Sequence, residues 1–485
     1  MSSNDLQHHA VPYKLPNSSK PQLSTIDVNR LRDSSIKYVR IQWVDLVNNI
    51  RYRVVPIDYF EKLLKTSRPG VSITKAAMGL IFITMADGFG PAGEYLYAID
   101  PASVKMCPYA LGHASVMGWF QEKTPTPGVD GHLAIEVDLC PRTILQRVIE
   151  NAKRLSGVEF LVGYETEFIL LKNTYPIEAV NQHGWSNSAA IPSGSVESKV
   201  LEEIVESLQA SRVEIQMYHA EAAPGQYEIV PGPLPPLQAV DTLIHTRETI
   251  FNVASKYGLR ATLAPRVFMD NCGSAAHTHI SVHSSSSTPS STSSSHPNLN
   301  HLESCFLAGL LAHLPSVLLL ALPTTESFKR MMDGAWSGGT YVSWGVDNRE
   351  TPVRLCNAGS PQARNFEIKT HDGTANPYLS LAGFLGAGME GVLENKECTI
   401  EDCGLELNTS AALLGEEKRK EMGIKDRLPL TWEAARKTFE VSELVDSVFG
   451  KEFKQKFLST NKTLREQMSH GLSNVEELKK YVENY

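Results

Sequence analysis

Cysteine is scarce in this sequence, and its spacing excludes two classes of protein. The 485 residues contain only seven cysteines, an odd number, and no two of them stand as C-x-x-C. This distribution argues against a disulfide framework and against a zinc site built from thiolates, and it favours a reducing compartment. Residues 1–10 are polar and lack the apolar stretch of a secretory signal. We therefore expect a cytoplasmic protein.

A surplus of positive charge is also missing. Lys and Arg total 46 against 54 Asp and Glu, so the net charge is −8 at pH 7. Proteins that bind nucleic acid or anionic membranes usually carry a basic surplus, so neither partner is expected. The longest apolar run, Cys305 to Leu322, is interrupted by His313, Pro315 and Ser316, and it predicts a buried helix rather than a membrane span. The expected partners are small molecules and further copies of the chain.

Two common catalytic loops are absent. The sequence contains neither G-x-x-x-x-G-K-[ST] nor G-x-S-x-G, which argues against a P-loop NTPase and against a serine hydrolase of the nucleophile-elbow type. With 42% hydrophobic and 21% charged residues, the chain can nevertheless bury a sizeable interior. Its length suggests about two or three domains, although one large integrated catalytic domain is also possible.

The N-terminal quarter predicts a tail followed by a β-rich domain. Residues 1–24 mix polar residues and proline without periodicity, so they are expected to form a disordered tail that carries no chemistry. Apolar and polar residues alternate over Lys37–Pro56 across an Asn48-Asn49 turn, which predicts a β-hairpin whose polar edge includes Asp45. This hairpin belongs to a predicted domain over residues 25–125. A Pro/Gly-rich joint at 124–131 then leads to a larger domain over 138–485.

The larger domain combines predicted helices with a long loop. A helical pattern opens at Cys140-Pro141-Arg142 and runs to Leu155, and two more are expected at 431–449 and 474–482. Residues 284–300 contain a serine-rich stretch that cannot build a packed core, so we expect a solvated loop insertion there.

Two pairs of carboxylates carry the strongest chemical signal. Glu165 and Glu167 interrupt an apolar strand pattern over 161–170, and the alternation of a strand places both on one face. Because burying unpaired carboxylates is costly, a cation should compensate them; a solvent-facing pair on an edge strand is the alternative. Glu221 and Glu228 flank a Pro-Gly turn that can fold both carboxylates towards one point.

Histidines and arginines follow the acids along the chain. After a glycine turn at Cys272-Gly273, the residues His277, His279 and Ser281 share one face of a predicted strand, and one imidazole could complete a carboxylate metal site. Further on come Arg330, Arg349, Arg354, Arg364, Glu367 and Lys369. Guanidinium groups bind carboxylates and phosphates bidentately and can neutralise charge during phosphoryl transfer. Metal ligands together with arginines therefore indicate phosphate chemistry.

In this order the motifs resemble those of the glutamine synthetase superfamily, over residues 36–485. The resemblance implies an α+β fold, with a small N-terminal β-grasp domain and a large catalytic domain that has an antiparallel sheet and flanking helices. It also implies a channel in which ATP and glutamate meet at two or three Mg²⁺ or Mn²⁺ ions. One ion would be held by Glu167, Glu221 and Glu228. The other would be held by Glu165, His277 and Glu367.

The same resemblance implies further roles. It assigns His279, Ser281, Arg354 and Arg364 to ATP, and Gly273, Arg330, Arg349 and Lys369 to glutamate or the transferred phosphoryl group. The implied reaction forms γ-glutamyl phosphate, which a nitrogen nucleophile then attacks. Cys272 stands where the family usually has Asn, and Lys369 where it usually has Arg. The acid substrate could therefore be a relative of glutamate.

The acceptor is indicated by Trp336. Ammonia-using members of the superfamily carry a glutamate six residues after the arginine that corresponds to Arg330, whereas this chain has Trp336. An indole can accept an alkylamine through apolar and cation–π contacts. This pattern resembles the glutamate–amine ligases, such as the γ-glutamylpolyamine synthetases. A tryptophan that merely packs a lid is the alternative.

Asp45 matches an aspartate that reaches the neighbouring subunit's active site in the superfamily. The match implies a homo-oligomer, expected to be a dodecamer of two stacked hexamers, while an ordinary turn carboxylate is the alternative. Two other functions stay open: a true glutamine synthetase that uses only ammonia, and a catalytically silent ring protein of the same fold. The retention of all six proposed metal ligands favours an enzyme, because buried acids without ions are costly.

Overall fold

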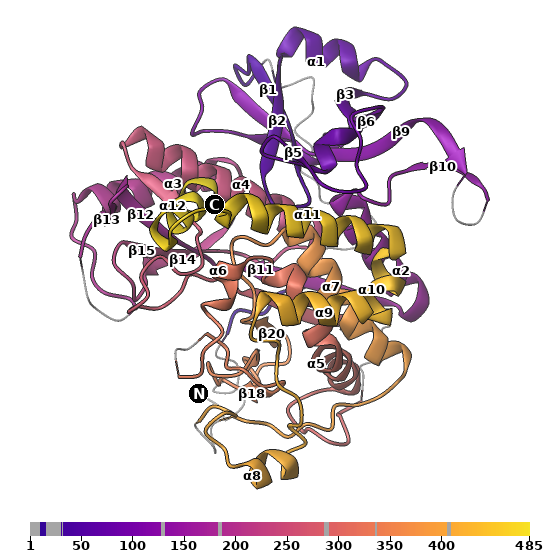
Figure 1. Ribbon diagram of the computed structural model, residues 1–485, viewed down its shortest axis with the longest axis vertical. Helices are drawn as coiled ribbons and strands as arrows, with labels where there is room; N and C mark the ends of the chain where they lie inside the picture. Colours follow the sequence, from indigo (N-terminus) through magenta and orange to yellow (C-terminus); the bar gives the residue numbers. More distant parts are fainter. Residues whose placement is uncertain are drawn as a thin grey trace.

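The computed structural model describes residues 10–15, 31, 33–127, 131–182, 187–285, 291–334, 337–404 and 409–485. A smaller β-rich part, indigo to purple in Figure 1, lies on one side of a larger part in which helices surround sheets. The predicted α+β class, with a β-rich N-terminal region and a large part that mixes sheets and helices, is confirmed.

The smaller part contains one α-helix and ten strands within the described ranges. Their bounds are β1 (Tyr38–Val44), β2 (Ile50–Pro56), α1 (Ile57–Leu64), β3 (Gly70–Thr74), β4 (Leu80–Ile81), β5 (Thr84–Met85), β6 (Glu94–Ile99), β7 (Lys105–Met106), β8 (His113–Val116), β9 (Gly118–Pro127) and β10 (Leu133–Glu136).

The predicted hairpin is confirmed, because β1 pairs antiparallel with β2 in a continuous register from Tyr38↔Pro56 to Val44↔Ile50. Asn48 takes the left-handed conformation in its turn, with φ 67°, a conformation that asparagine tolerates. Asp45 differs from the expectation of a polar edge, since it is only 2% exposed. Its carboxylate accepts hydrogen bonds from Val47 N, Asn49 N and Arg51 Nε, which satisfies it inside the turn.

The proline-rich stretch after residue 123 is a strand rather than a joint as far as the structure describes it. Residues 118–127 form β9, which pairs antiparallel with β6 and β10. Pro125 and Pro127 lie at its exposed end, where a missing N–H breaks no central ladder. Residues 128–130, the tip of the connection to β10, lie outside the described residues.

The larger part contains the remaining elements. Their bounds are α2 (Pro141–Ser156), β11 (Val158–Tyr164), β12 (Thr166–Thr174), β13 (Ile177–Ala179), α3 (Val196–Ala210), β14 (Ile215–Ala220), β15 (Gln226–Pro231), α4 (Pro236–Lys256), β16 (Arg260–Thr262), β17 (Thr278–Ser284), α5 (His301–Ala321), α6 (Thr325–Phe328), β18 (Trp344–Val346), β19 (Val353–Cys356), β20 (Asn365–Ile368), α7 (Pro377–Leu393), α8 (Glu416–Glu421), α9 (Trp432–Val441), α10 (Glu443–Phe449), α11 (Lys451–Ser469) and α12 (Asn474–Asn484).

Two sheets of the larger part meet at Glu165. One has the strand order β11-β17-β20-β19-β18, and the other has the order β13-β12-β15-β14, with β16 beside β12. The predicted single strand over 161–170 is therefore two strands in different sheets, separated by Glu165. The switch is fixed by long-range hydrogen bonds, because Glu165 N donates to His277 O at 3.1 Å and Glu167 N donates to Ala275 O at 3.3 Å.

The apolar run forms a buried helix, as predicted. Helix α5 begins with a capping box between Asn300 and Glu303, which satisfies free N–H groups at its start. It packs closely on α7, since a side chain at Gly309 would lie 2.4 Å from Ala387 O. By length and composition α5 could cross a membrane, but 72% of its apolar window is buried inside the protein, which identifies it as a core helix.

Helices also end the chain, with one difference from the prediction. The pattern over 431–449 is two helices, α9 and α10, because Ser442 ends the first and its hydroxyl caps the second by accepting from Val445 N. Helix α12 confirms the pattern over 474–482, and Pro141–Ser156 confirms the one after Cys140. Of the predicted serine-rich loop, residues 286–290 lie outside the described residues.

Candidate active site

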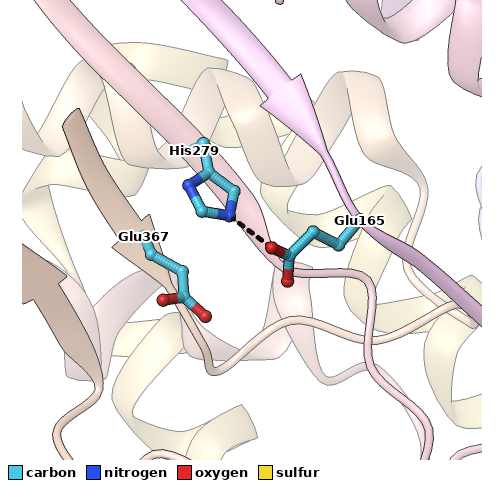
Figure 2. Close-up of side chains that lie close together, drawn as sticks. All are labelled: Glu165, His279 and Glu367. Carbon is cyan, nitrogen blue, oxygen red and sulfur yellow. Dashed lines mark ion pairs between the residues drawn. The ribbon is translucent and has the colours of Figure 1, made fainter. Parts of the chain in front are cut away.

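Acidic and imidazole side chains from both sheets converge where the chain crosses between them. Glu165 lies at the crossover itself, while Glu167 belongs to β12 and Glu228 to the neighbouring strand β15. His279 on β17 and Glu367 on β20 are register partners in the other sheet. Figure 2 shows both reaching towards Glu165, and a dashed line marks the ion pair of His279 with Glu165. Residues far apart in the sequence thus share one small volume.

His277 lies at the centre of this cluster. Its Nδ1 is 2.8 Å from Glu165 Oε2, 3.5 Å from Glu367 Oε1 and 3.8 Å from Glu167 Oε1. Ligand atoms of Glu165, Glu228 and His277 lie within 4.8 Å of one another, as do those of Glu165, His279 and Glu367. Such spacings suit one divalent cation per group, with carboxylate oxygens and an imidazole nitrogen as ligands.

A further group contains His219, a residue that the sequence analysis missed. His219 Nε2 lies 3.2 Å from Glu228 Oε1, and its Nδ1 lies 3.4 Å from Glu221 Oε1. The predicted Pro-Gly turn creates this proximity, because Gly225 has φ +64° and joins β14 to β15 with His219 opposite Glu228. The signal was the H-x-E spacing of His219 and Glu221 just before the turn, which places both on one side of an extended segment.

The site is held in place by the backbone and by neutral groups. Glu167 Oε2 accepts from Ala275 N at 2.9 Å and from Gln226 Nε2 at 3.2 Å. Gly273 is required beside it, because a Cβ there would lie 2.6 Å from Pro265 O and 2.7 Å from Arg330 Cγ. The glycine therefore lets the 265–273 backbone and the arginine approach the acids closely.

Burial of several carboxylates close together dominates the electrostatics. Burial, together with the charges of Glu165 and Glu167, raises the pKa of Glu228 to about 8. Burial also raises the pKa of Glu167 and of Glu221. A bound cation would remove both costs, since it replaces lost hydration and offsets the like charges. The donor set therefore fits hard divalent ions.

One carboxylate behaves differently because cations already surround it. Lys369 Nζ lies 3.2 Å from Glu367 Oε1, and Arg354 Nη1 lies 3.0 Å from Glu367 Oε2. Although burial acts in the other direction, Lys369 and His277 lower the pKa of Glu367 to about 2. Glu367 is thus fixed as an anion between the carboxylate–histidine cluster and two positive side chains.

Arg330 adds a buried positive charge near Glu167. It is only 3% exposed, and its Nη1 donates to His371 O at 3.3 Å. Its Nε has no hydrogen-bond partner among the described residues. Leaving a buried guanidinium nitrogen unpaired is costly, so this atom marks where an anionic ligand could bind.

A cavity of about 630 Å³ opens beside the cluster. Glu165 and His279 belong to the cluster and also line the cavity. Ser281, Cys356 and Arg364 are among the other residues that line it. Its volume lies in the range that encloses a ligand as large as a nucleotide. Of the four residues that the sequence assigns to ATP, His279, Ser281 and Arg364 line this cavity. The fourth, Arg354, forms an ion pair with Glu367.

Some predicted site residues are engaged elsewhere or lie apart. Arg364 directs its guanidinium to Glu303 of α5, at 2.7 Å between Nη2 and Oε2. Arg349 is exposed, and its charge only partly opposes the burial that raises the pKa of Glu221. Asp45 is buried in its own hairpin turn. Trp336 lies outside the described residues.

Comparison with known protein families gives one match. A model described as the glutamine synthetase catalytic domain matches residues 138–481. That range contains every proposed metal ligand and excludes the β-rich part.

Curated relatives cover most of this chain. "Protein fluG" of Emericella nidulans is 32% identical over 443 residues, which are 90% of this chain and 47% of that protein. This chain therefore spans about half the length of that relative. "Type-1 glutamine synthetase 1" of Dictyostelium discoideum is 30% identical, with 77% and 78% covered. "Glutamate--isopropylamine ligase" of a Pseudomonas species is 28% identical, with 93% and 95% covered.

A solved structure shares the fold. The structure described as "GmaS/ADP complex-Conformation 1" superposes with a TM-score of 0.75 at 21% identity, and it covers 93% of this chain and 97% of its own. Its coverage extends beyond residues 138–481, so the β-rich part is included in the likeness.

Proposed function

Because this chain belongs to the glutamine synthetase family, we propose that it joins glutamate to an amine in an ATP-dependent reaction. The family's catalytic domain implies an ATP-dependent glutamate ligase. The observation that carries the proposal is the convergence of Glu165, Glu167, Glu228, Glu367 and His277 beside a cavity of nucleotide size.

Two sets of residues are proposed to hold divalent ions. Glu167, Glu221 and Glu228 form one set, and Glu165, His277 and Glu367 form the other. Mg²⁺ or Mn²⁺, when bound, would supply charge neutralisation for the phosphate oxygens and the leaving group. His219 is so close to Glu221 and Glu228 that we add it as a neighbour of the first set.

The positive side chains are proposed to bind and orient the anionic reactants. We assign His279, Ser281 and Arg364, which line the cavity, and Arg354, which is paired with Glu367, to ATP. Gly273, Arg330, Arg349 and Lys369 are assigned to glutamate or to the transferred phosphoryl group. Charges fixed in a dry site stabilise a loose phosphoryl transition state without reorganising. The buried Arg330 and Lys369 meet this requirement, at 3% and 2% exposed.

The proposed reaction has two steps. A γ-carboxylate oxygen of glutamate attacks the terminal phosphorus of ATP, so that a new O–P bond forms and the bond to ADP breaks. The amine nitrogen then attacks the acyl carbon, the C–O bond to phosphate breaks, and the nitrogen loses a proton. Catalysis of such transfers comes almost entirely from positioning the reactants in line and from electrostatic stabilisation of the transition state.

An amine is preferred to ammonia as the acceptor because of Trp336. An aromatic wall favours an alkylammonium group, whereas a carboxylate at that position would favour ammonium. The glutamate–isopropylamine ligase among the relatives supports this choice. Use of ammonia is the second candidate, and the Dictyostelium relative, described as a glutamine synthetase, supports it.

An acceptor panel tests this proposal. Phosphate release is measured with ATP, Mg²⁺ and glutamate plus ammonia, ethylamine, ethanolamine or putrescine, with mass spectrometry of the products. We expect an amine to outperform ammonia. Trp336→Glu should shift the preference towards ammonia, while Trp336→Phe, the matched control, should keep it. No phosphate release with any acceptor would favour the catalytically silent ring protein. An equal ratio of amine to ammonia use in the wild type, Trp336→Glu and Trp336→Phe would contradict the assignment of Trp336 to the acceptor site.

Assembly and location complete the proposal. A ring of two stacked hexamers, in which Asp45 contributes to a neighbour's site, and a cytoplasmic location both stay predictions. Size-exclusion chromatography with light scattering measures the first directly.

A further inference from the structure

Residues 10–15, here called the N-terminal strap, lie against the cavity beside the active site. The phenol of Tyr13 donates a hydrogen bond to Glu214 Oε1 at 2.7 Å and accepts one from Gln216 Nε2. The backbone N–H of Tyr13 donates to Gln362 O at 3.3 Å. The strap is thus anchored at three points.

These anchors come from both sheets of the larger part. Glu214 and Gln216 stand at the start of β14, in the sheet that carries Glu167 and Glu228. Gln362 stands in the loop between β19 and β20, in the sheet that carries His279 and Glu367. The strap therefore bridges the two walls of the cavity, and Ala10, Val11 and Tyr13 are part of its lining.

The anchor on β14 precedes the residues of that strand that contact the carboxylate cluster. Along β14, Gln216 is three residues before His219, and a strand rises about 3.3 Å per residue. The anchor at Gln216 is therefore offset along β14 by roughly 10 Å from His219, the residue of this strand that contacts Glu228. If the phosphates of a nucleoside triphosphate lie near that cluster, its base lies at the end where Tyr13 stands.

The chemistry of the strap suits a purine base. Tyr13 offers an aromatic face, and base–aromatic stacking does not depend on a particular hydrogen-bond pattern. Because two polar side chains hold its hydroxyl, the ring has little freedom left to lose when a base binds. Val11 and Ala10 extend the apolar surface next to it.

We propose that the N-terminal strap forms the base-end wall of the nucleotide pocket and that Tyr13 positions the base. This inference rests on the proposed function, since it requires ATP in the cavity. The strap lies outside residues 138–481, the range that matches the family's catalytic domain, so it would be a feature added to the catalytic domain by this chain's own N-terminal region.

Deletion and substitution separate this role from a structural one. The wild type, Tyr13→Ala, Tyr13→Phe and a deletion of residues 1–15 are compared with a control deletion of residues 1–9, which keeps the strap. Dissociation constants for ADP with Mg²⁺ are measured by calorimetry, together with KM for ATP and KM for glutamate. Circular dichroism reports whether each variant is folded. The anchors Glu214, Gln216 and Gln362 are exposed, so loss of the strap should leave the core intact.

We expect Tyr13→Ala and the longer deletion to raise Kd for ADP and KM for ATP about tenfold or more, as for the loss of one stacking contact. KM for glutamate should stay within about twofold, and Tyr13→Phe and the shorter deletion should resemble the wild type more closely. Equal nucleotide affinity with and without the strap would overturn the inference while the proposed function stands. Tighter binding after deletion would also overturn it, because the strap would then obstruct the pocket. Failure of the wild type to bind any nucleotide would instead contradict the proposed function.

Discussion

Glu228 is the residue whose surroundings are hardest to explain without a cation. Its carboxylate is buried on β15, opposite His219 and one strand from Glu167, and its pKa is raised to about 8 by burial and neighbouring acids. A side chain kept in this state lowers the stability of the protein at neutral pH. An apolar residue would be more stable at this buried position, so the presence of a carboxylate indicates a functional role for Glu228.

Replacement of Glu228 by alanine should abolish turnover and weaken metal binding. Outer-sphere changes at metal sites already cost roughly 10-fold to 100-fold in affinity, so loss of a direct ligand should cost at least about 100-fold for Mn²⁺. Titration with Mn²⁺ and the ATP-dependent release of phosphate measure both effects. Glu202→Ala on α3, where the side chain is exposed, is the matched control. Unchanged Mn²⁺ affinity in Glu228→Ala would contradict the metal assignment.

Local sequence predicts some site residues and cannot predict others. Glu165, Glu167 and His277 can be predicted from the sequence, because burying acids and imidazoles within apolar strand patterns is costly unless they are paired. The spacing of His219 and Glu221 also places these two side chains on one side of an extended segment. The ion pair of Arg364 with Glu303 cannot be predicted from local sequence, because the two residues meet only when α5 packs beside β20.

Among the strand and helix boundaries, too, some follow from local sequence and others depend on contacts in the finished fold. The hairpin β1–β2 follows from alternation and turn residues, both of which are local. The break at Glu165 does not, since it depends on hydrogen bonds to residues 275–277. The break at Ser442 depends on a hydroxyl that caps α10, a signal that an unbroken helical period conceals.

The C-terminal helix α12 ends in a residue that fastens it to the rest of the protein. Tyr485 is 4% exposed, and its hydroxyl donates to Val47 O of the β-rich part at 3.1 Å. Its backbone oxygen accepts from Leu263 N at 2.7 Å. One residue therefore connects α12, the turn after β1 and the segment after β16.

Two substitutions at Tyr485 should differ in size. Tyr485→Phe removes one buried hydrogen bond and should lower the free energy of unfolding by about 1 kcal/mol. Tyr485→Ala also leaves a cavity and should lower it by about 3–5 kcal/mol. Urea denaturation followed by tryptophan fluorescence measures both, and Tyr59→Phe on α1, half exposed, is the control. A loss below about 1 kcal/mol for the alanine variant would mean that α12 is not tied to the core through this ring.

The two parts of the whole molecule share one core and one buried ion cluster. Trp43 and Phe120 of the β-rich part belong to the same apolar cluster as Phe306 of α5. Arg142 lies 2.7 Å from Asp100 Oδ2 and 2.8 Å from Asp241 Oδ2, and so joins the parts by charge. The order of motifs predicted the overall fold class, while no local pattern predicts that residues 10–15 contact β14, because that contact depends on the finished fold.

Divalent ions should stabilise the whole molecule if both sheets contribute ligands. A ligand present at 100 times its dissociation constant adds about 2.7 kcal/mol to the free energy of unfolding. Addition of Mn²⁺ to chelator-treated protein should therefore raise Tm by several degrees, as measured by differential scanning calorimetry. The Glu228→Ala variant should respond much less. An equal rise in both proteins would indicate that the ion acts at some other place.

The crossover at Glu165 has a consequence for how the site can be tuned. Glu165 is the single residue between β11 and β12, which belong to different sheets. A slide or tilt of one sheet against the other would therefore change the distance between the carboxylate oxygens of Glu367 in one sheet and of Glu228 in the other. Mg²⁺ tolerates only a narrow octahedral arrangement, whereas larger ions accept looser ones. If the proposed ions bind here, their selection would depend on how the two sheets are aligned, and changes in packing far from the ligands would alter it.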